Sequence, residues 1–304
     1  MEIICGGKLN NSYATAVTIG NFDGVHLGHQ KLLMELTKQA KEKNLKSLVY
    51  TFSEHPVQVM KGNLFAISGK EEKIRLMEKA GVDILYFADF LSVKDLSPTE
   101  FVDEVLIKEL HMHVAVIGEN NRFGKKSCGD ATLLCKLGEE RGFPVYVVAF
   151  HKVDGVVCSS SAIRESLING KIEQAEKLLG RPYSVSGTVV DGKHLGRTYG
   201  FPTINMMPPD SSLLPKTGVY ATNATVKGKT YPAITNVGET SFDEKKIFRI
   251  ETHILDFNED VYGEDAEITF LRYMRDIQPF ASTEELEDRL KKDREIRYHM
   301  REEK

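Results

Sequence analysis

Two histidines three residues apart, His26 and His29, are the side chains whose type and spacing best suit chemistry on an anion. They lie in the glycine-rich stretch 20–29, GNFDGVHLGH, between a short apolar run and a segment with helical periodicity. Both can therefore occupy one face of the first turn of a helix, where free N–H groups attract anions. Imidazoles placed there can donate hydrogen bonds to charge that develops on a phosphate. The stretch predicts a polyphosphate site for phosphoryl or nucleotidyl transfer.

Two other interpretations of the histidine pair are open. The histidines could form a metal pair with a nearby carboxylate, although no cysteine or third histidine lies close by in the sequence. They could also be surface residues at the start of a helix. The glycines of the stretch and the strand before it favour the phosphate interpretation, because glycine lets a backbone bend and approach a ligand closely.

Three consecutive hydroxyl side chains, Ser159 to Ser161, open a later helical segment that carries Arg164. Helix N-capping explains one such serine well and three poorly. The hydroxyls, the helix N-terminus and the guanidinium together predict a second anion site. In a parallel-sheet fold this site is expected to face the histidine loop, so that the two clamp one triphosphate.

The second half of the chain carries Thr203 and Asn205, which are two residues apart and point to the same side of an extended segment. Their oxygens could ligate a hard cation such as Mg²⁺, which keeps few protein ligands and several waters. The spacing alone favours a simpler interpretation, in which they are ordinary polar residues on the wet face of a strand. Glycines at 192, 196 and 200 could form a flap over phosphates, and the stretch has no P-loop pattern.

The elements that must position these residues alternate from residue 15 to about residue 180. Apolar runs typical of strands are 15–20, 47–52, 84–88, 113–117 and 144–149, and helical patterns lie near 28–43, 69–80, 98–110 and 129–141. Capping boxes are predicted at Ser68 with Glu71 and at Ser97 with Glu100, and Gly81 and Gly142 fall where helices should stop. The alternation predicts a parallel sheet with helices on both faces, which binds ligands at the carboxyl ends of its strands.

Helical patterns end at residues 180–182, so a domain boundary is expected between residues 182 and 183. Alternating, β-branched segments follow at 184–190, 218–226, 230–236, 248–257 and 266–271, with a hairpin turn at 226–229. Many short strands with Gly and Pro turns predict a sandwich or a barrel. Ser282 with Glu285 begins a last helix to about residue 301, whose charged residues are expected to form a solvated face.

Composition bounds the class of protein. The chain has 304 residues, of which 41% are hydrophobic and 28% charged, and a net charge of −4, so nothing favours nucleic acid or an anionic membrane surface as a partner. Its apolar runs are too short for a signal peptide or a membrane span. Four cysteines without metal or redox spacing indicate reduced thiols and a cytoplasmic location.

Motifs along nearly the whole chain resemble those of the prokaryotic bifunctional riboflavin kinase/FMN adenylyltransferases, which are also called FAD synthetases. The motif at residues 20–29 also resembles that of the HxGH nucleotidyltransferases in general. The motifs are GNFDGVHLGH at 20–29, TFSEHP at 51–56, GENNRFG at 118–124, SSSAIR at 159–164, GRTYGFPTIN at 196–205, NVG at 236–238 and ETHILDF at 251–257. The sequence departs from the family's pattern at Glu54 (usually Pro), at Asn121 (usually aromatic), at Ile277 (usually Glu) and in the shorter stretch 239–242.

The resemblance implies a doubly wound α/β nucleotidyltransferase domain over residues 1–182 and an antiparallel β-barrel kinase domain with a terminal helix over 183–304. The barrel would phosphorylate riboflavin to FMN, and the first domain would adenylylate FMN to FAD and release pyrophosphate, with Mg²⁺ accompanying ATP in the reaction. The alternatives are a kinase with weak or lost adenylyltransferase activity and a non-catalytic flavin-binding regulator.

The resemblance also implies residue roles. Catalytic roles fall to His26, His29 and Glu251, the last as general base, and metal binding to Thr203 and Asn205. ATP or phosphate binding falls to Asn21, Gly28, Ser160, Ser161, Arg164, Gly196, Gly200, Thr203 and Asn205. Flavin binding falls to His55, Asn120, Phe123 and Arg275.

Overall fold

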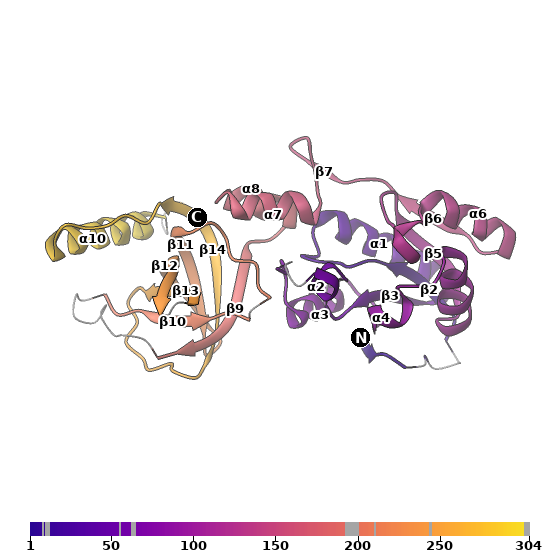
Figure 1. The fold of residues 1–304 in the computed structure, drawn as a ribbon, viewed down its shortest axis with the longest axis horizontal. Coiled ribbons are helices and arrows are strands. Elements are labelled where there is room, and N and C mark those ends of the chain that lie inside the picture. Colours follow the sequence, from indigo (N-terminus) through magenta and orange to yellow (C-terminus); the bar gives the residue numbers. More distant parts are fainter. Residues whose placement is uncertain are drawn as a thin grey trace. The chain divides into compact units, whose positions relative to one another are not determined.

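A computed structural model describes residues 1–7, 9, 13–54, 56–61, 65–191, 201–209, 211–242 and 245–300 of the chain (Figure 1). The chain divides into two compact units, residues 1–160 and 161–304. This division groups the helices α7 (Ser160–Ile168) and α8 (Ile172–Leu179) with the second unit. The boundary at residues 182 and 183 remains a prediction.

The first unit is built on a six-stranded sheet in the order β1-β4-β3-β2-β5-β6, in which neighbouring strands are parallel. The strands are β1 (Glu2–Cys5), β2 (Thr15–Ile19), β3 (Lys46–Phe52), β4 (Ile84–Ala88), β5 (Met112–Gly118) and β6 (Val145–Val148). The chain runs outward from β2 through β3 to β4 and then returns to the other side of β2 as β5. The carboxyl ends of β2 and β5 therefore flank the switch point, where such sheets bind ligands.

Helical segments connect the strands. They are α1 (Leu27–Glu42), α2 (Pro56–Lys61), α3 (Lys70–Lys79), α4 (Phe90–Val93), α5 (Pro98–Glu100), the π-helical η1 (Phe101–Glu109), the 3₁₀ turn η2 (Lys125–Ser127) and α6 (Ala131–Arg141). A small hairpin of β7 (Lys152–Val153) and β8 (Val156–Val157) precedes α7.

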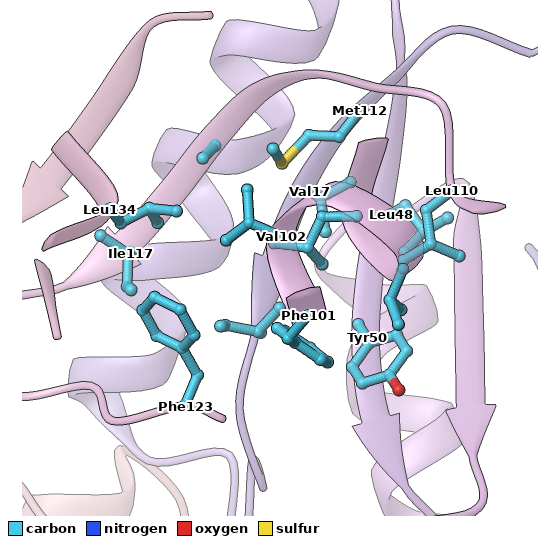
Figure 2. Packing of buried hydrophobic residues seen from close by; sticks show 14 of the residues in the cluster. Val17, Leu48, Tyr50, Phe101, Val102, Leu110, Met112, Ile117, Phe123 and Leu134 are labelled. Carbon is cyan, nitrogen blue, oxygen red and sulfur yellow. The ribbon is translucent and has the colours of Figure 1, made fainter. Parts of the chain in front are cut away.

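Two hydrophobic clusters cover the two faces of the sheet, because successive strand residues point to opposite sides. Val17 and Ile19 belong to one cluster, with Phe101 and Val102 of η1 and Leu134 of α6. Figure 2 shows Val17, Phe101, Val102 and Leu134 of this cluster between the sheet and the helices. Ala16 and Val49 belong to the other cluster, together with residues of α1 and α3. The prediction of a doubly wound parallel sheet is therefore confirmed.

One of the two predicted capping boxes is present. Ser97 and Glu100 exchange the two expected hydrogen bonds at the start of α5. The capping box predicted at Ser68 is wrong: Gly69 is the N-cap of α3 and makes no side-chain cap bond. The Ser68 hydroxyl is buried and instead accepts the backbone N–H of Gly24 at 3.0 Å. A buried N–H that needs a partner has displaced the local cap.

The second unit is a closed antiparallel barrel in the strand order β10-β13-β12-β11-β14-β9. The strands are β9 (Tyr183–Val190), β10 (Ile204–Met207), β11 (Gly218–Val226), β12 (Lys229–Phe242), β13 (Lys245–Ile254) and β14 (Asp265–Arg275). Lys227 and Gly228 have φ of 48° and 73°, as a type I′ hairpin turn requires, so the predicted turn is confirmed. In the shorter stretch after Gly238 the backbone is paired, with Glu239 opposite Phe248.

Three threonines form a hydrogen-bonded chain inside the barrel. Thr235 Oγ1 lies 2.8 Å from Thr222 Oγ1 and 2.9 Å from Thr252 Oγ1, and all three side chains are fully buried. Met206, Val237 and Ile250 are also fully buried. These residues mark the strand faces that point into the barrel, so the alternate residues point outward.

The last helix, α10 (Thr283–His299), is capped by the Ser282 hydroxyl as predicted. The expectation that its charged residues form a solvated face is wrong at Asp293 and Arg297, which are buried. Asp293 accepts hydrogen bonds from Arg275 of β14, and Arg297 donates to the backbone oxygen of Thr222. These buried partners on the barrel compensate for the lost hydration of the two charges.

Within the ranges that the structure describes, no helix combines the length and the apolar character needed to cross a bilayer.

Candidate active sites

The histidine pair forms the beginning of α1, as predicted. His26 is the N-cap, and its Nδ1 accepts the backbone N–H of His29 at 3.3 Å. The two imidazole rings stack with centroids 3.6 Å apart, and Phe22 packs against His29 at 5.0 Å. The pair is therefore built as part of a helix cap, at the end of the helix that attracts anions.

His29 is held neutral by its surroundings. Burial lowers the pKa of its imidazole well below the usual value, and the nearby His26 and Lys73 lower it further. Its Nδ1 is buried and has no hydrogen-bond partner among the described residues. A neutral imidazole carries one N–H, so it can donate a hydrogen bond to a phosphate without being protonated first.

Gly28 lies between the histidines because a side chain does not fit there. A Cβ at this position would come within 3.1 Å of the His26 ring and 3.2 Å of the backbone oxygen of Cys158. The Gly28 N–H also donates to the Cys158 thiol. The glycine therefore allows the segment before α7 to pack directly against the helix start.

A buried polar network holds the loop between β2 and α1. Asp23 accepts hydrogen bonds from the backbone N–H groups of Ile67 at 2.9 Å and Ser68 at 3.3 Å. The buried Lys73 ammonium donates to the backbone oxygens of Asn21 at 2.9 Å and Phe52 at 3.4 Å, and burial lowers its pKa to about 8. This lysine ties the ends of β2 and β3 together.

The same loop has a strained backbone. Phe22 and Val25 adopt φ of 48° and 37°, a region in which non-glycine residues are uncommon. Each such residue costs about 1–3 kcal/mol and persists where the surrounding contacts hold it. The network around Asp23 and Lys73 supplies those contacts.

Of the other predicted site residues in this part of the chain, Ser160 contacts the loop between β2 and α1. The Ser160 hydroxyl donates to the backbone oxygen of Asp23 at 3.0 Å. Ser161 and Arg164 lie on α7, in the second unit, and their part in an anion site remains a prediction. Asn120 is exposed on the loop after β5, whereas Phe123 of that loop is buried in the core against Phe101.

Asn121, which stands where the family has an aromatic residue, has a structural role. Its side-chain amide donates to the backbone oxygen of Ile19 at 2.5 Å and so joins the loop after β5 to the end of β2. The predicted site residues His55, Gly196 and Gly200 lie outside the described residues.

The candidate site of the barrel is a row of polar side chains on its outer face. Glu251 of β13 pairs with Asn205 of β10 on one side and with Asn236 of β12 on the other. Paired residues of antiparallel strands point to the same face, opposite to the buried Thr235 and Thr252. The register therefore places Asn205 and Glu251 side by side, which the sequence did not predict, and it adds Asn236, which sequence reasoning noted only as part of a motif.

The side-chain oxygens of the two asparagines in this row have no hydrogen-bond partner in the part of the chain that the structure describes. The Oδ1 atoms of Asn205 and Asn236 are buried and accept no hydrogen bond from the described residues, and Asn205 is 7% exposed. Oxygen atoms in this state suit a hard cation or a hydroxyl donor. Asn205 therefore has the chemistry that the predicted metal-binding role needs, and the role of Thr203 remains a prediction.

A pocket of 430 Å³ lies at Thr203, and the three residues of the row are not part of its lining. It is lined by Thr203 and Ile204, by Thr252 and Ile254 of β13, and by the loop 257–262 that follows. Its volume is in the range of sites that bind small ligands. Segment 201–203 is held beside it by His253, whose Nδ1 lies 2.8 Å from the Pro202 oxygen.

Arg275, a predicted flavin-binding residue, ends β14 and pairs with Val219, the neighbour of Asn236 on β11. Its guanidinium donates to Asp293 of α10 at 2.7–3.3 Å and to the backbone oxygen of Asp276 at 3.2 Å. These bonds fix α10 on the barrel, and a direct contact of Arg275 with flavin remains a prediction.

A parallel sheet with a histidine pair at a helix N-terminus, joined to a barrel with a carboxylate between two amides, is typical of an enzyme of nucleotide chemistry. Family models agree: the one described as FAD synthetase matches residues 8–162, and the one described as riboflavin kinase matches residues 179–300. The chain belongs to the family of bifunctional riboflavin kinase/FMN adenylyltransferases.

Individual relatives match over nearly the whole chain. A bifunctional riboflavin kinase/FMN adenylyltransferase from Listeria monocytogenes is 38% identical over 282 residues, covering 91% of this chain and 89% of the relative. The protein of that description from Bacillus subtilis is 36% identical over 293 residues, covering 93% and 92%. A crystal structure described as a macrolide-efflux protein from Streptococcus pneumoniae has a TM-score of 0.90 and 30% identity, covering 98% of this chain and 99% of that one.

Proposed function

We propose that this chain carries out both activities of its family. The barrel transfers the γ-phosphoryl group of ATP to the 5′-hydroxyl of riboflavin, and the first unit transfers the adenylyl group of a second ATP to FMN. The observation that carries the proposal is the opposite chemistry of the two sites: the first presents neutral hydrogen-bond donors at a helix N-terminus, and the second presents oxygen acceptors around a carboxylate.

In the kinase reaction, Glu251 accepts the proton of the 5′-hydroxyl as the hydroxyl oxygen forms a bond to the γ-phosphorus. The bond from that phosphorus to the bridging oxygen of ADP breaks, and ADP leaves. The pocket beside Thr203 and Ile204 holds the nucleotide. Thr203 and Asn205 are the residues that would hold Mg²⁺, which neutralises charge on the ATP phosphates when it is bound.

In the adenylyltransferase reaction, a phosphate oxygen of FMN forms a bond to the α-phosphorus of ATP, and pyrophosphate leaves. No covalent intermediate with the enzyme is needed, so catalysis consists of positioning and charge stabilisation. His26, His29 and the N–H groups at the start of α1 stabilise the charge on the transferring phosphate. Ser160, Ser161 and Arg164 are proposed to bind the other phosphates. The proposed substrates are the small molecules ATP, riboflavin and FMN. We propose no nucleic-acid or membrane partner, and a cytoplasmic location for the enzyme.

The test is chromatography of the products formed from riboflavin, ATP and Mg²⁺. Formation of FMN and FAD supports the full proposal. Formation of FMN alone, at saturating ATP and with added FMN left unconverted, would show that the adenylyltransferase has been lost. A protein that binds flavin and forms neither product would be the non-catalytic regulator, and the proposal would be wrong.

A further inference from the structure

We propose that Asn236 binds a secondary hydroxyl of the ribityl chain of riboflavin and so sets the enzyme's preference for flavins that carry this chain. The inference rests on the proposed kinase function of the barrel. It begins from the row Asn205–Glu251–Asn236, which the register of β10, β13 and β12 places side by side.

The position of Asn236 in the row determines which part of the substrates it can reach. Asn205, which is proposed with Thr203 to hold Mg²⁺ and ATP, lies on β10, and β10 and β12 flank β13 on opposite sides. The phosphates and the metal therefore belong on the Asn205 side of Glu251. The 5′-hydroxyl must meet Glu251 itself, so the remainder of the flavin extends to the Asn236 side.

The spacing suits a hydroxyl of the same chain. Directly paired residues in neighbouring antiparallel strands have Cα atoms about 4.5–5.5 Å apart. A substrate whose 5′-hydroxyl donates to Glu251 therefore brings its next hydroxyls to Asn236. The Oδ1 of Asn236 is buried and without a hydrogen-bond donor among the described residues, so a substrate hydroxyl would complete its bonding.

The surface beyond Asn236 changes from polar to apolar. Gly238 is two residues further along β12 on the same face, and a Cβ there would come within 3.1 Å of the Ile277 side chain. Ile277 is 50% exposed. A site with acceptor oxygens first and an aliphatic side chain next matches a polyhydroxylated chain attached to a planar apolar ring.

The experiment compares two flavins that differ in the ribityl chain. Riboflavin carries the chain with its hydroxyls, and lumiflavin carries a methyl group in its place. Their dissociation constants are measured from flavin fluorescence for the wild-type protein, for Asn236→Leu, which removes the acceptor at similar volume, and for Asn236→Asp, which keeps an acceptor oxygen. Lys229→Ala, at the exposed start of the same strand, is the control. Far-UV circular dichroism and urea midpoints establish that each variant is folded.

We expect Asn236→Leu to weaken riboflavin binding about threefold to tenfold, the effect of one hydrogen bond, and to leave lumiflavin binding unchanged. Asn236→Asp should recover most of the riboflavin affinity, and Lys229→Ala should match the wild type. Equal losses for both flavins, or no loss for riboflavin, would overturn the inference while the proposed function stands. A wild-type protein that neither binds riboflavin nor forms FMN would overturn both.

Discussion

The histidine loop of the first unit and the Asn205–Glu251–Asn236 row of the second are positioned in different ways. The loop departs from regular structure, with positive φ at Phe22 and Val25, and depends on the buried partners of Asp23 and Lys73. The row consists of ordinary strand residues and depends only on how three strands are paired.

The two sites also present opposite groups to a ligand. The loop supplies N–H groups, which complement the negative charge of a transferring phosphate. The row supplies oxygens, which would complement a cation and a hydroxyl that loses its proton in the proposed kinase reaction. In the proposed mechanisms, the adenylyl transfer needs charge stabilisation, and the phosphorylation also needs a base.

The largest effect is expected from Glu251→Gln, which keeps the shape of the row and removes its base. A general base typically contributes about 10²–10⁴-fold, so FMN formation should fall on that scale. FAD formation from supplied FMN should be unchanged, as measured by chromatography of both products. Unchanged FMN formation would show that Glu251 is not the base.

The corresponding change in the first unit is His29→Ala. Loss of one donor aimed at developing charge costs about 10²–10³-fold in rate, so FAD formation from FMN should fall by that factor. Turnover of riboflavin to FMN should stay near the wild-type value. A large loss of both activities would contradict the separation into two independent sites.

Asp293→Asn tests whether the barrel also depends on a buried charge. Asp293 is fully buried and pairs with Arg275 at 2.7 Å and Arg289 at 3.1 Å. Removing one partner of a buried ion pair costs about 3–5 kcal/mol, and the lower end is expected because both arginines are partly exposed. Urea unfolding followed by circular dichroism measures the change.

The control for that variant is Asp288→Asn on the same helix. Asp288 is exposed and faces Lys291 at 3.4 Å. An exposed pair contributes about 0–1 kcal/mol, so its urea midpoint should stay close to that of the wild type. Equal midpoints for Asp293→Asn and Asp288→Asn would show that α10 is not held by the buried pair.

Gly28→Ala should reduce FAD formation about tenfold, because displacing catalytic groups by less than 1 Å already affects the rate. The added methyl group would press on the His26 ring and the Cys158 oxygen. Gly69→Ala is the matched control for a glycine of the same unit, since Gly69 has an ordinary φ of −66° and a Cβ there meets only the Glu71 carboxylate, at 3.8 Å. Steady-state kinetics of FAD formation should separate the two variants, and identical rates would show that the close packing is dispensable.

The smallest effect is expected from Asn121→Ala, which removes the bond to the Ile19 oxygen. One hydrogen bond contributes about 0.5–1.5 kcal/mol, so the KM for FMN or ATP should rise a few-fold with little change in kcat. A kcat that falls while KM stays constant would instead place Asn121 in the chemical step.

Features with a local signal could be predicted from the sequence. The hairpin at Lys227–Gly228, the cap at Ser97 and the helix starting beside His26 each follow from residues within one turn. The alternation of apolar runs was enough for the parallel sheet. The short strand β10 was not predicted as a strand, because four residues show too little alternation to be recognised.

Features that depend on pairing between distant residues could not be predicted. Ser68 bonds Gly24, 44 positions away, instead of capping its own helix. Asn236 lies beside Glu251 through the register of β12 and β13, which nothing near Asn236 in the sequence encodes. The burial of Asp293 likewise depends on Arg275 of another element.

The pairing of β12 also limits how this hairpin can change in length during evolution. Side chains alternate between the two faces of a strand, so one residue inserted between Gly228 and Asn236 would turn Asn236 into the barrel interior. A second inserted residue would return it to the outer face. Insertions and deletions in the strands of this hairpin are therefore expected to involve even numbers of residues. The loops around the histidines have no such restriction, because they are not paired strands.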